Sequence, residues 1–159
     1  MASQDPGPVL SEHRGMVAAP IGRVRDLVLT VPTGEFSGAE VPLVIGDQGD
    51  RPVVVTGGPG AFRATVAGVP MTIEVDRDAG WVQARGEWWW CGRFSVAEDG
   101  SGHTVVCRQT FNCAAGPVGR LVPFTIGRGH RRAGARALRR LLDDLGRRLD
   151  CETWLLPDR

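Results

Sequence analysis

Residues 51–113 read RPVVVTGGPGAFRATVAGVPMTIEVDRDAGWVQARGEWWWCGRFSVAEDGSGHTVVCRQTFNC and are rich in β-branched and aromatic residues. Turn-forming sequences divide this stretch: Gly-Gly-Pro-Gly at 57–60, Asp-Arg-Asp-Ala-Gly at 76–80 and Glu-Asp-Gly-Ser-Gly at 98–102. Short β-forming runs between such turns are typical of antiparallel strands joined by hairpins. The stretch therefore predicts a meander of antiparallel strands.

The first strands of this meander alternate between apolar and polar residues. Successive side chains of a strand point to opposite faces of its sheet. One face collects Phe62, Ala64, Val66, Met71, Ile73 and Val75, and the other collects Arg63, Thr65, Thr72, Glu74 and Asp76. We therefore expect a sheet with one apolar face and one face in water.

The segments before the meander are predicted to be a strand, a short helix and an irregular region. Residues 9–18 have a strand-like pattern, and Pro20 opens an amphipathic helical run that ends before Pro32. Residues 33–52 contain repeated Gly and Pro and show no sustained period. Residues 1–8 are expected to be a flexible N-terminus.

The C-terminal part has a helical period from residue 116 to residue 149, with a break expected around Pro123 and Gly127. At 100° per residue, one side of this helix carries Gly134, Ala137, Leu138, Leu141, Leu145 and Leu149, and the other carries Arg132, Arg136, Arg139, Arg140 and Arg147. An amphipathic helix is therefore expected to cover the sheet, and residues 151–159 to form a locally packed tail. The predicted class is α+β.

Three sequence segments resemble the SRPBCC superfamily, which includes START-like lipid carriers and polyketide cyclase/dehydrase-like proteins. They are VAAPIGRVRD at 17–26, GGPGAFRATVAGVPMTIEV at 57–75, and GPVGRL at 116–121 before the arginine-rich helix. The resemblance implies a helix-grip fold, a curved antiparallel sheet wrapped around a long C-terminal α-helix, in a single domain over residues 9–150. It also implies a cavity between sheet and helix that takes an apolar or aromatic small molecule, such as a lipid, an isoprenoid or a polyketide-like compound.

The candidate ligand-binding residues come from three places in the chain. Alternation puts Trp88, Trp90, Gly92 and Phe94 on one strand face, and Gln109 on a face with Phe111. Aromatic faces suit flat apolar ligands, and a lone amide in an apolar wall suits ligand orientation. Gly134, Ala137 and His130 are the helix candidates. Core packing is the alternative for the aromatic residues and Gln109, and close approach of the helix to the sheet is the alternative for Gly134 and Ala137.

His130 is a candidate catalytic residue, because it lies on the apolar side of the last helix, where an imidazole can donate a hydrogen bond or act as acid or base, and Gln109 is the second polar group considered for proton transfer. A structural histidine is the alternative. His13 and His103 are expected to be solvated. The strand from Trp81 to Glu87 leaves its facing open, with an outward ion pair between Arg85 and Glu87 as the expectation.

The composition excludes several classes of site. All nineteen basic residues are arginines, so Schiff-base chemistry and the lysine of a phosphate-binding P-loop are excluded. Three separated histidines and four cysteines without a CxxC spacing predict no metal site and favour free thiols. No cofactor is expected.

Small-molecule binding is therefore the first hypothesis for function. The alternative is a polyketide cyclase or dehydratase that uses the same cavity, and whether the chain is an enzyme stays open. A second alternative is an interaction protein whose arginine-rich helix face binds RNA, an acidic protein or an anionic membrane surface. DNA is not expected as a partner. The absence of an export signal or a long apolar run predicts a cytoplasmic protein.

Overall fold

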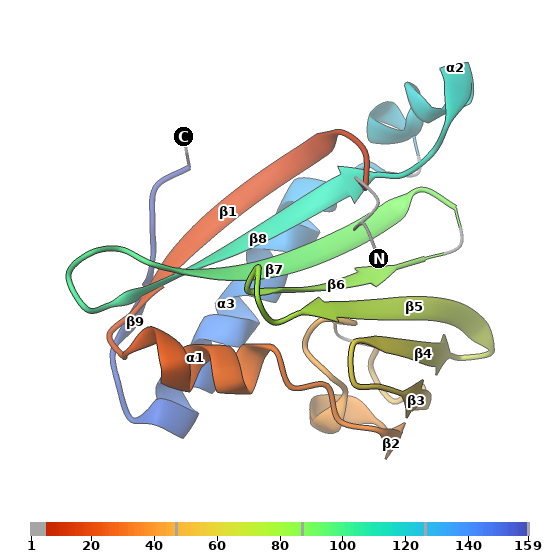
Figure 1. The fold of residues 1–159 in the computed structure, drawn as a ribbon. Helices are drawn as coiled ribbons and strands as arrows, with labels where there is room; N and C mark the ends of the chain where they lie inside the picture. The colour runs from red at the N-terminus through yellow and green to blue at the C-terminus, as the bar shows by residue number, and fades with distance from the viewer. Residues whose placement is uncertain (1–5, 47, 87, 126, 159) are drawn as a thin grey trace.

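The fold consists of a nine-stranded antiparallel sheet and three α-helices in a computed structural model that describes residues 6–158 apart from 47, 87 and 126 (Figure 1). The strand order is β2-β3-β4-β5-β6-β7-β8-β1-β9. The strands from β2 to β8 follow one another as a meander, and the N-terminal strand β1 pairs with β8. The meander predicted over residues 51–113 is therefore confirmed. It is extended on one side by β2, which lies in the segment 33–52 where no strand was predicted, and bordered on the other side by β1.

The elements follow the predicted order. The strands are β1 (Val9–Val17), β2 (Gly34–Phe36), β3 (Val53–Gly57), β4 (Ala61–Val66), β5 (Val69–Asp76), β6 (Trp81–Arg85), β7 (Trp90–Glu98), β8 (Thr104–Asn112) and β9 (Thr153–Leu155). The helices are α1 (Ile21–Val28), α2 (Gly116–Gly119) and α3 (His130–Leu149), and two 3-10 helices span Gly38–Glu40 and Val122–Phe124.

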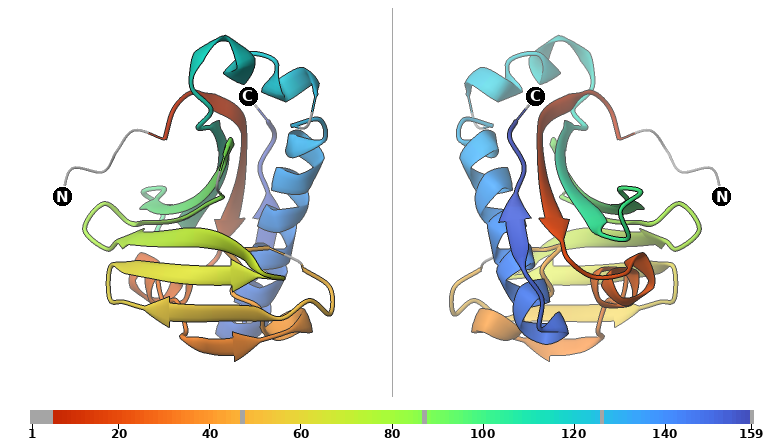
Figure 2. Two further views of the ribbon diagram at one scale, coloured as in Figure 1. Left: turned by 90° about the vertical axis from the view of Figure 1, so that its right-hand side faces the viewer. Right: turned by 90° about the vertical axis from the view of Figure 1, so that its left-hand side faces the viewer.

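The sheet curves around α3, which runs along its inner side (Figure 2). Helix α3 contacts β1, β8 and β9, while α1 packs against β7 and touches α3. This is the curved sheet and long C-terminal helix expected for a helix-grip arrangement, so the predicted α+β class is confirmed. None of the described helices is long and apolar enough to cross a membrane.

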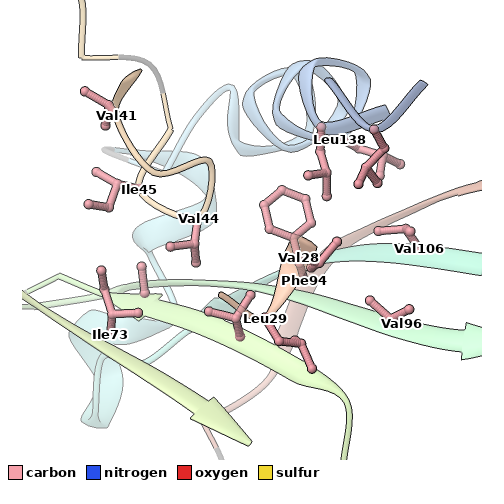
Figure 3. Close-up of a cluster of buried hydrophobic side chains, with 14 of the residues drawn as sticks. Val28, Leu29, Val41, Val44, Ile45, Ile73, Phe94, Val96, Val106 and Leu138 are labelled. Carbon is pink, nitrogen blue, oxygen red and sulfur yellow. The ribbon is translucent and has the colours of Figure 1, made fainter. Parts of the chain in front are cut away.

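The core lies between the inner face of the sheet and α3. Phe62, Ala64, Val66 and Ile73 are buried there, as the alternation of β4 and β5 predicts. Figure 3 shows the ring of Phe94 in this core, with Leu138 of α3 and valines of the sheet around it. Phe94 is 1% exposed. It is therefore a central core residue.

Helix α3 has the predicted amphipathic pattern. Its buried residues are Gly134, Leu138, Leu141, Leu142, Leu145 and Leu149. The expected break before it is also present, because α2 and the Val122–Phe124 3-10 helix precede a helix that begins only at His130. Gly15 favours the close packing of α3 on β1, because a Cβ atom there would lie 2.5 Å from Leu142 Cδ1 and would displace that side chain.

Both ends of the described chain are tied to the sheet more closely than the sequence predicted. The tail forms β9, which pairs with β1 from Val17↔Thr153 to Gly15↔Leu155. At the other end, the amide of Asn112 donates to the carbonyl of Pro8. The tail therefore extends the sheet. Residues 1–5 of the expected flexible N-terminus lie outside the described residues.

The outward face of β6 carries Trp81, Gln83 and Arg85, because Val82 and Ala84 lie in the core. Gln83 accepts hydrogen bonds from the guanidinium of Arg93, whose Cζ lies 4.4 Å from the ring centroid of Trp81. The sequence left open which face of the sheet Trp81, Gln83 and Arg85 occupy, and the structure places them on the face away from α3. The Arg85–Glu87 pair cannot be placed, since Glu87 lies outside the described residues.

Candidate functional site

A cavity of about 840 Å³ lies between the sheet, α3 and the segment 38–46. The segment contributes Gly38, Ala39, Val41, Leu43, Ile45 and Gly46, the sheet contributes Trp90, Arg108 and Thr110, and α3 contributes residues from His130 to Arg147. Side chains from three separate parts of the sequence therefore converge on one space.

The segment 38–46 forms an apolar wall without regular strand structure. It continues from the Gly38–Glu40 3-10 helix into a turn over residues 43–45. Val41 and Ile45 are buried, and Figure 3 shows Val41, Val44 and Ile45 on this part of the chain. The sequence analysis found no period here, because a turn has none to show. This wall was therefore not predicted.

Gly134 and Ala137 both line the cavity but differ in what their small size provides. A Cβ atom on Gly134 would lie 3.2 Å from Cδ2 of His13 and 3.6 Å from Oγ1 of Thr110. Gly134 therefore allows the close approach of α3 to the sheet. Ala137 is half-buried one turn further on and borders open space. Ala137 is thus the position from which a larger side chain would enter the cavity.

The sheet wall contains a buried arginine. Arg108 is 5% exposed, and its Cζ lies 4.6 Å from the ring centroid of Phe94 and 5.7 Å from that of Trp90. Its Nε and Nη1 atoms have no hydrogen-bond partner among the described residues. Burial lowers the pKa of Arg108 to about 10 because the charged form loses its hydration. Even so, the guanidinium is charged at neutral pH.

Gly92 makes room for this arginine. A Cβ atom there would lie 2.3 Å from Nη2 of Arg108 and 2.7 Å from Cζ2 of Trp90. Gly92 does not line the cavity itself. It was predicted to be a ligand-binding residue, and in the structure the side chain of Arg108 fills the space beside it. The predicted common face of Trp90, Gly92 and Phe94 is nevertheless the inner face.

Two predicted wall residues lie on the opposite side of the sheet. Arg108 and Thr110 point to the cavity, so the alternate residues of β8, Gln109 and Phe111, point outward. The amide of Gln109 donates to the carboxylate of Glu12 at 2.8 Å, and Arg93 lies over the ring of Phe111. The assignment of Gln109 and Phe111 to the cavity wall is therefore wrong.

Trp88 and Phe94 also lie outside the larger cavity. Trp88 is 53% exposed and precedes β7, so the strand alternation that was applied to it does not hold. Phe94 borders a separate space of about 150 Å³ beside Leu141 and Leu145. Among the tryptophans considered, Trp90 is the one at the cavity.

His130 lines the cavity at the first residue of α3. Its Nδ1 atom is buried and has no partner among the described residues. Burial lowers the pKa of His130, and the charges of Arg131 and His13 lower it further, so the neutral form predominates at pH 7. His13, which was expected to be solvated, has a side chain only 11% exposed and places Nδ1 3.1 Å from a carboxylate oxygen of Asp158.

The rim of the cavity on α3 is rich in arginine. Arg136, Arg139, Arg140 and Arg147 line it together with Asp143 and Asp144. Asp144 forms ion pairs with Arg147 at 3.2 Å and with Arg148 at 2.8 Å. The helix face that was considered for a macromolecular partner is thus partly the edge of the cavity.

The described residues contain no group of three or more His, Cys, Asp or Glu side chains that could hold a metal ion. The four cysteines are unpaired. The polar side chains that line the cavity are cationic or neutral, apart from the two aspartates on the rim.

No protein-family model matches the chain, and no curated protein is significantly similar to it in sequence. Among solved structures, the chain is similar to the crystal structure of TTHA0849 from Thermus thermophilus. The TM-score is 0.45 and the sequence identity is 16%, over 85% of this chain and 97% of that one.

Proposed function

We propose that this protein binds an apolar or aromatic small molecule in the cavity between the sheet and α3, as a member of the SRPBCC superfamily. The observation that carries the proposal is the cavity itself. Its volume of about 840 Å³ lies in the range of about 300–1,000 Å³ that is typical of small-molecule sites.

The lining of the cavity supports this function. Val41, Leu43, Ile45 and Trp90 provide apolar contact surface, while nine of the nineteen lining residues have polar side chains, five of them arginines. In ligand sites, apolar surface supplies affinity and placed polar groups fix the orientation of the ligand. The lipid, isoprenoid and polyketide-like compounds inferred from the sequence resemblance all have apolar surface that such a site would bind.

Replacing Ala137 by tryptophan is expected to reduce ligand affinity by roughly tenfold or more, because the indole would occupy space that the ligand needs. The measurement is native mass spectrometry of the purified protein with identification of released small molecules, followed by titration of each one. Ala97→Trp is the matched control, since Ala97 is exposed on β7 and does not line the cavity. Equal affinity of both variants and the natural protein would place the ligand elsewhere and contradict the proposal.

A cyclase or dehydratase is the second candidate, and the position of His130 favours it. A neutral imidazole with an unpartnered buried Nδ1 at a ligand cavity is suited to proton transfer. If a bound polyketide-like chain is turned over, His130→Ala should abolish turnover while the chain still binds. Turnover at an unchanged rate would remove His130 from the mechanism.

A further inference from the structure

Arg108 has no counter-ion in the described part of the protein. No salt bridge reaches it, and its Nε and Nη1 atoms have no hydrogen-bond partner there. Its neighbours on the inner face are the aromatic rings of Phe94 and Trp90. A buried charge without a partner is strongly unfavourable, so an anion bound beside Arg108 would stabilise the protein.

The guanidinium lies at the cavity, so the cavity is where such an anion would bind. Arg108 is among the residues that line the cavity, and Thr110 lies two residues further along the same strand face. The missing side chain at Gly92 lets the guanidinium lie between the strand and the two aromatic rings. The rings restrict the planar group without neutralising it, because an aromatic ring carries no net charge.

We propose that the ligand is an amphipathic carboxylic acid whose carboxylate pairs with Arg108 while its apolar part occupies the cavity. This inference rests on the proposed small-molecule binding and specifies the class of ligand. A planar guanidinium binds a carboxylate through parallel N–H···O bonds. One buried positive charge also matches a monoanion, whereas a phosphate dianion would leave a negative charge buried.

The arginines on the rim fit the same class of ligand. Arg136, Arg139 and Arg147 are exposed on α3 beside the cavity. Positive charge around an opening raises the local concentration of anions and their rate of association. Arg147 pairs with Asp144, so Arg136 and Arg139 are the rim residues best suited to attract a carboxylate, and Arg108 is the residue suited to hold it.

The test is calorimetric titration with two matched pairs of probes: dodecanoate with dodecanol, and 2-naphthoate with 2-naphthalenemethanol. The natural protein should bind at least one acid about 10- to 100-fold more tightly than its alcohol, as a charge-assisted hydrogen bond predicts. Arg108→Met should remove this preference and leave the affinity for the alcohol nearly unchanged. Arg108→Lys, which keeps the charge, should retain part of the preference.

Two controls locate the effect. Arg132→Met removes an exposed arginine of α3 that does not line the cavity, and the acid preference should persist. Ala137→Trp should weaken acid and alcohol together, because it obstructs the cavity. An acid preference that survives Arg108→Met would overturn the role of Arg108.

The outcomes also separate this inference from the function on which it rests. If acid and alcohol bind equally, and Ala137→Trp weakens both, then the cavity binds apolar molecules and the carboxylate inference is wrong. If none of the four probes binds the natural protein, both the inference and the proposed apolar site are overturned.

Discussion

Replacing Phe94 by alanine is expected to lower the free energy of unfolding by about 3–5 kcal/mol, the range for removal of a buried aromatic ring. The ring is 1% exposed and lies where β7, α3 and the segment 38–46 meet, beside Leu141, Leu145 and Val44. Two effects add. The ring's apolar surface is lost from the core, and the small space of about 150 Å³ beside it becomes larger.

Urea denaturation followed by circular dichroism measures this change. Phe124→Ala is the matched control, because Phe124 is 76% exposed and an exposed substitution usually changes stability by less than about 0.5 kcal/mol. A loss below about 1 kcal/mol for Phe94→Ala would mean that α3 and the segment 38–46 collapse onto the vacated space. The cavity walls would then be far more adaptable than their packing indicates.

The sequence predicted the sheet and α3 well because both have a strong period. In β4, Phe62, Ala64 and Val66 alternate with polar residues, and only one facing buries all three. In α3, leucines recur at helical spacing from Leu138 to Leu149, about three turns, so the buried side follows directly. For elements with such a strong period, the sequence alone predicts which side is buried.

Prediction failed on β8, where both sets of alternating residues contain apolar side chains. Val105, Cys107 and Phe111 indicated that their face, which includes Gln109, is the inner one, and Arg108 belongs to the other face. The structure has the opposite assignment, because tertiary pairing with β7 and β1 fixes the register. Burial of a charge contradicts the rule that charged residues face solvent, and such contradictions are expected at functional sites.

Short elements account for the remaining differences. Strand β9 has three residues, too few for alternation to distinguish it from a loop, and it forms because β1 offers a free edge. The apolar wall at 38–46 is likewise stabilised by contacts with distant residues. Neither local propensity nor hydrophobic period contains that information.

The second large effect is expected at Arg108, where substitution should stabilise the protein, whereas Phe94→Ala should destabilise it. Arg108→Met is expected to raise the free energy of unfolding of the ligand-free protein by about 1–4 kcal/mol, the range found when buried ion pairs are replaced by apolar residues of similar volume, because an unpaired buried charge costs at least as much as a paired one. The substitution loses two cation–π contacts worth about 0.5–2 kcal/mol each. It also removes the cost of burying a charge that is 5% exposed and has two unpartnered nitrogen atoms, and this cost outweighs the lost contacts.

Thermal unfolding of the ligand-free protein measures the difference, and a gain of this size corresponds to roughly 2–4 °C per kcal/mol for a chain of this length. Arg132→Met, at an exposed position, should leave the melting temperature nearly unchanged. A clear loss of stability in Arg108→Met would show that the guanidinium is already compensated in the ligand-free protein, and the case for an anionic ligand would fail. A gain in stability together with loss of acid binding would mean that Arg108 is retained at the expense of stability, as expected for a binding residue.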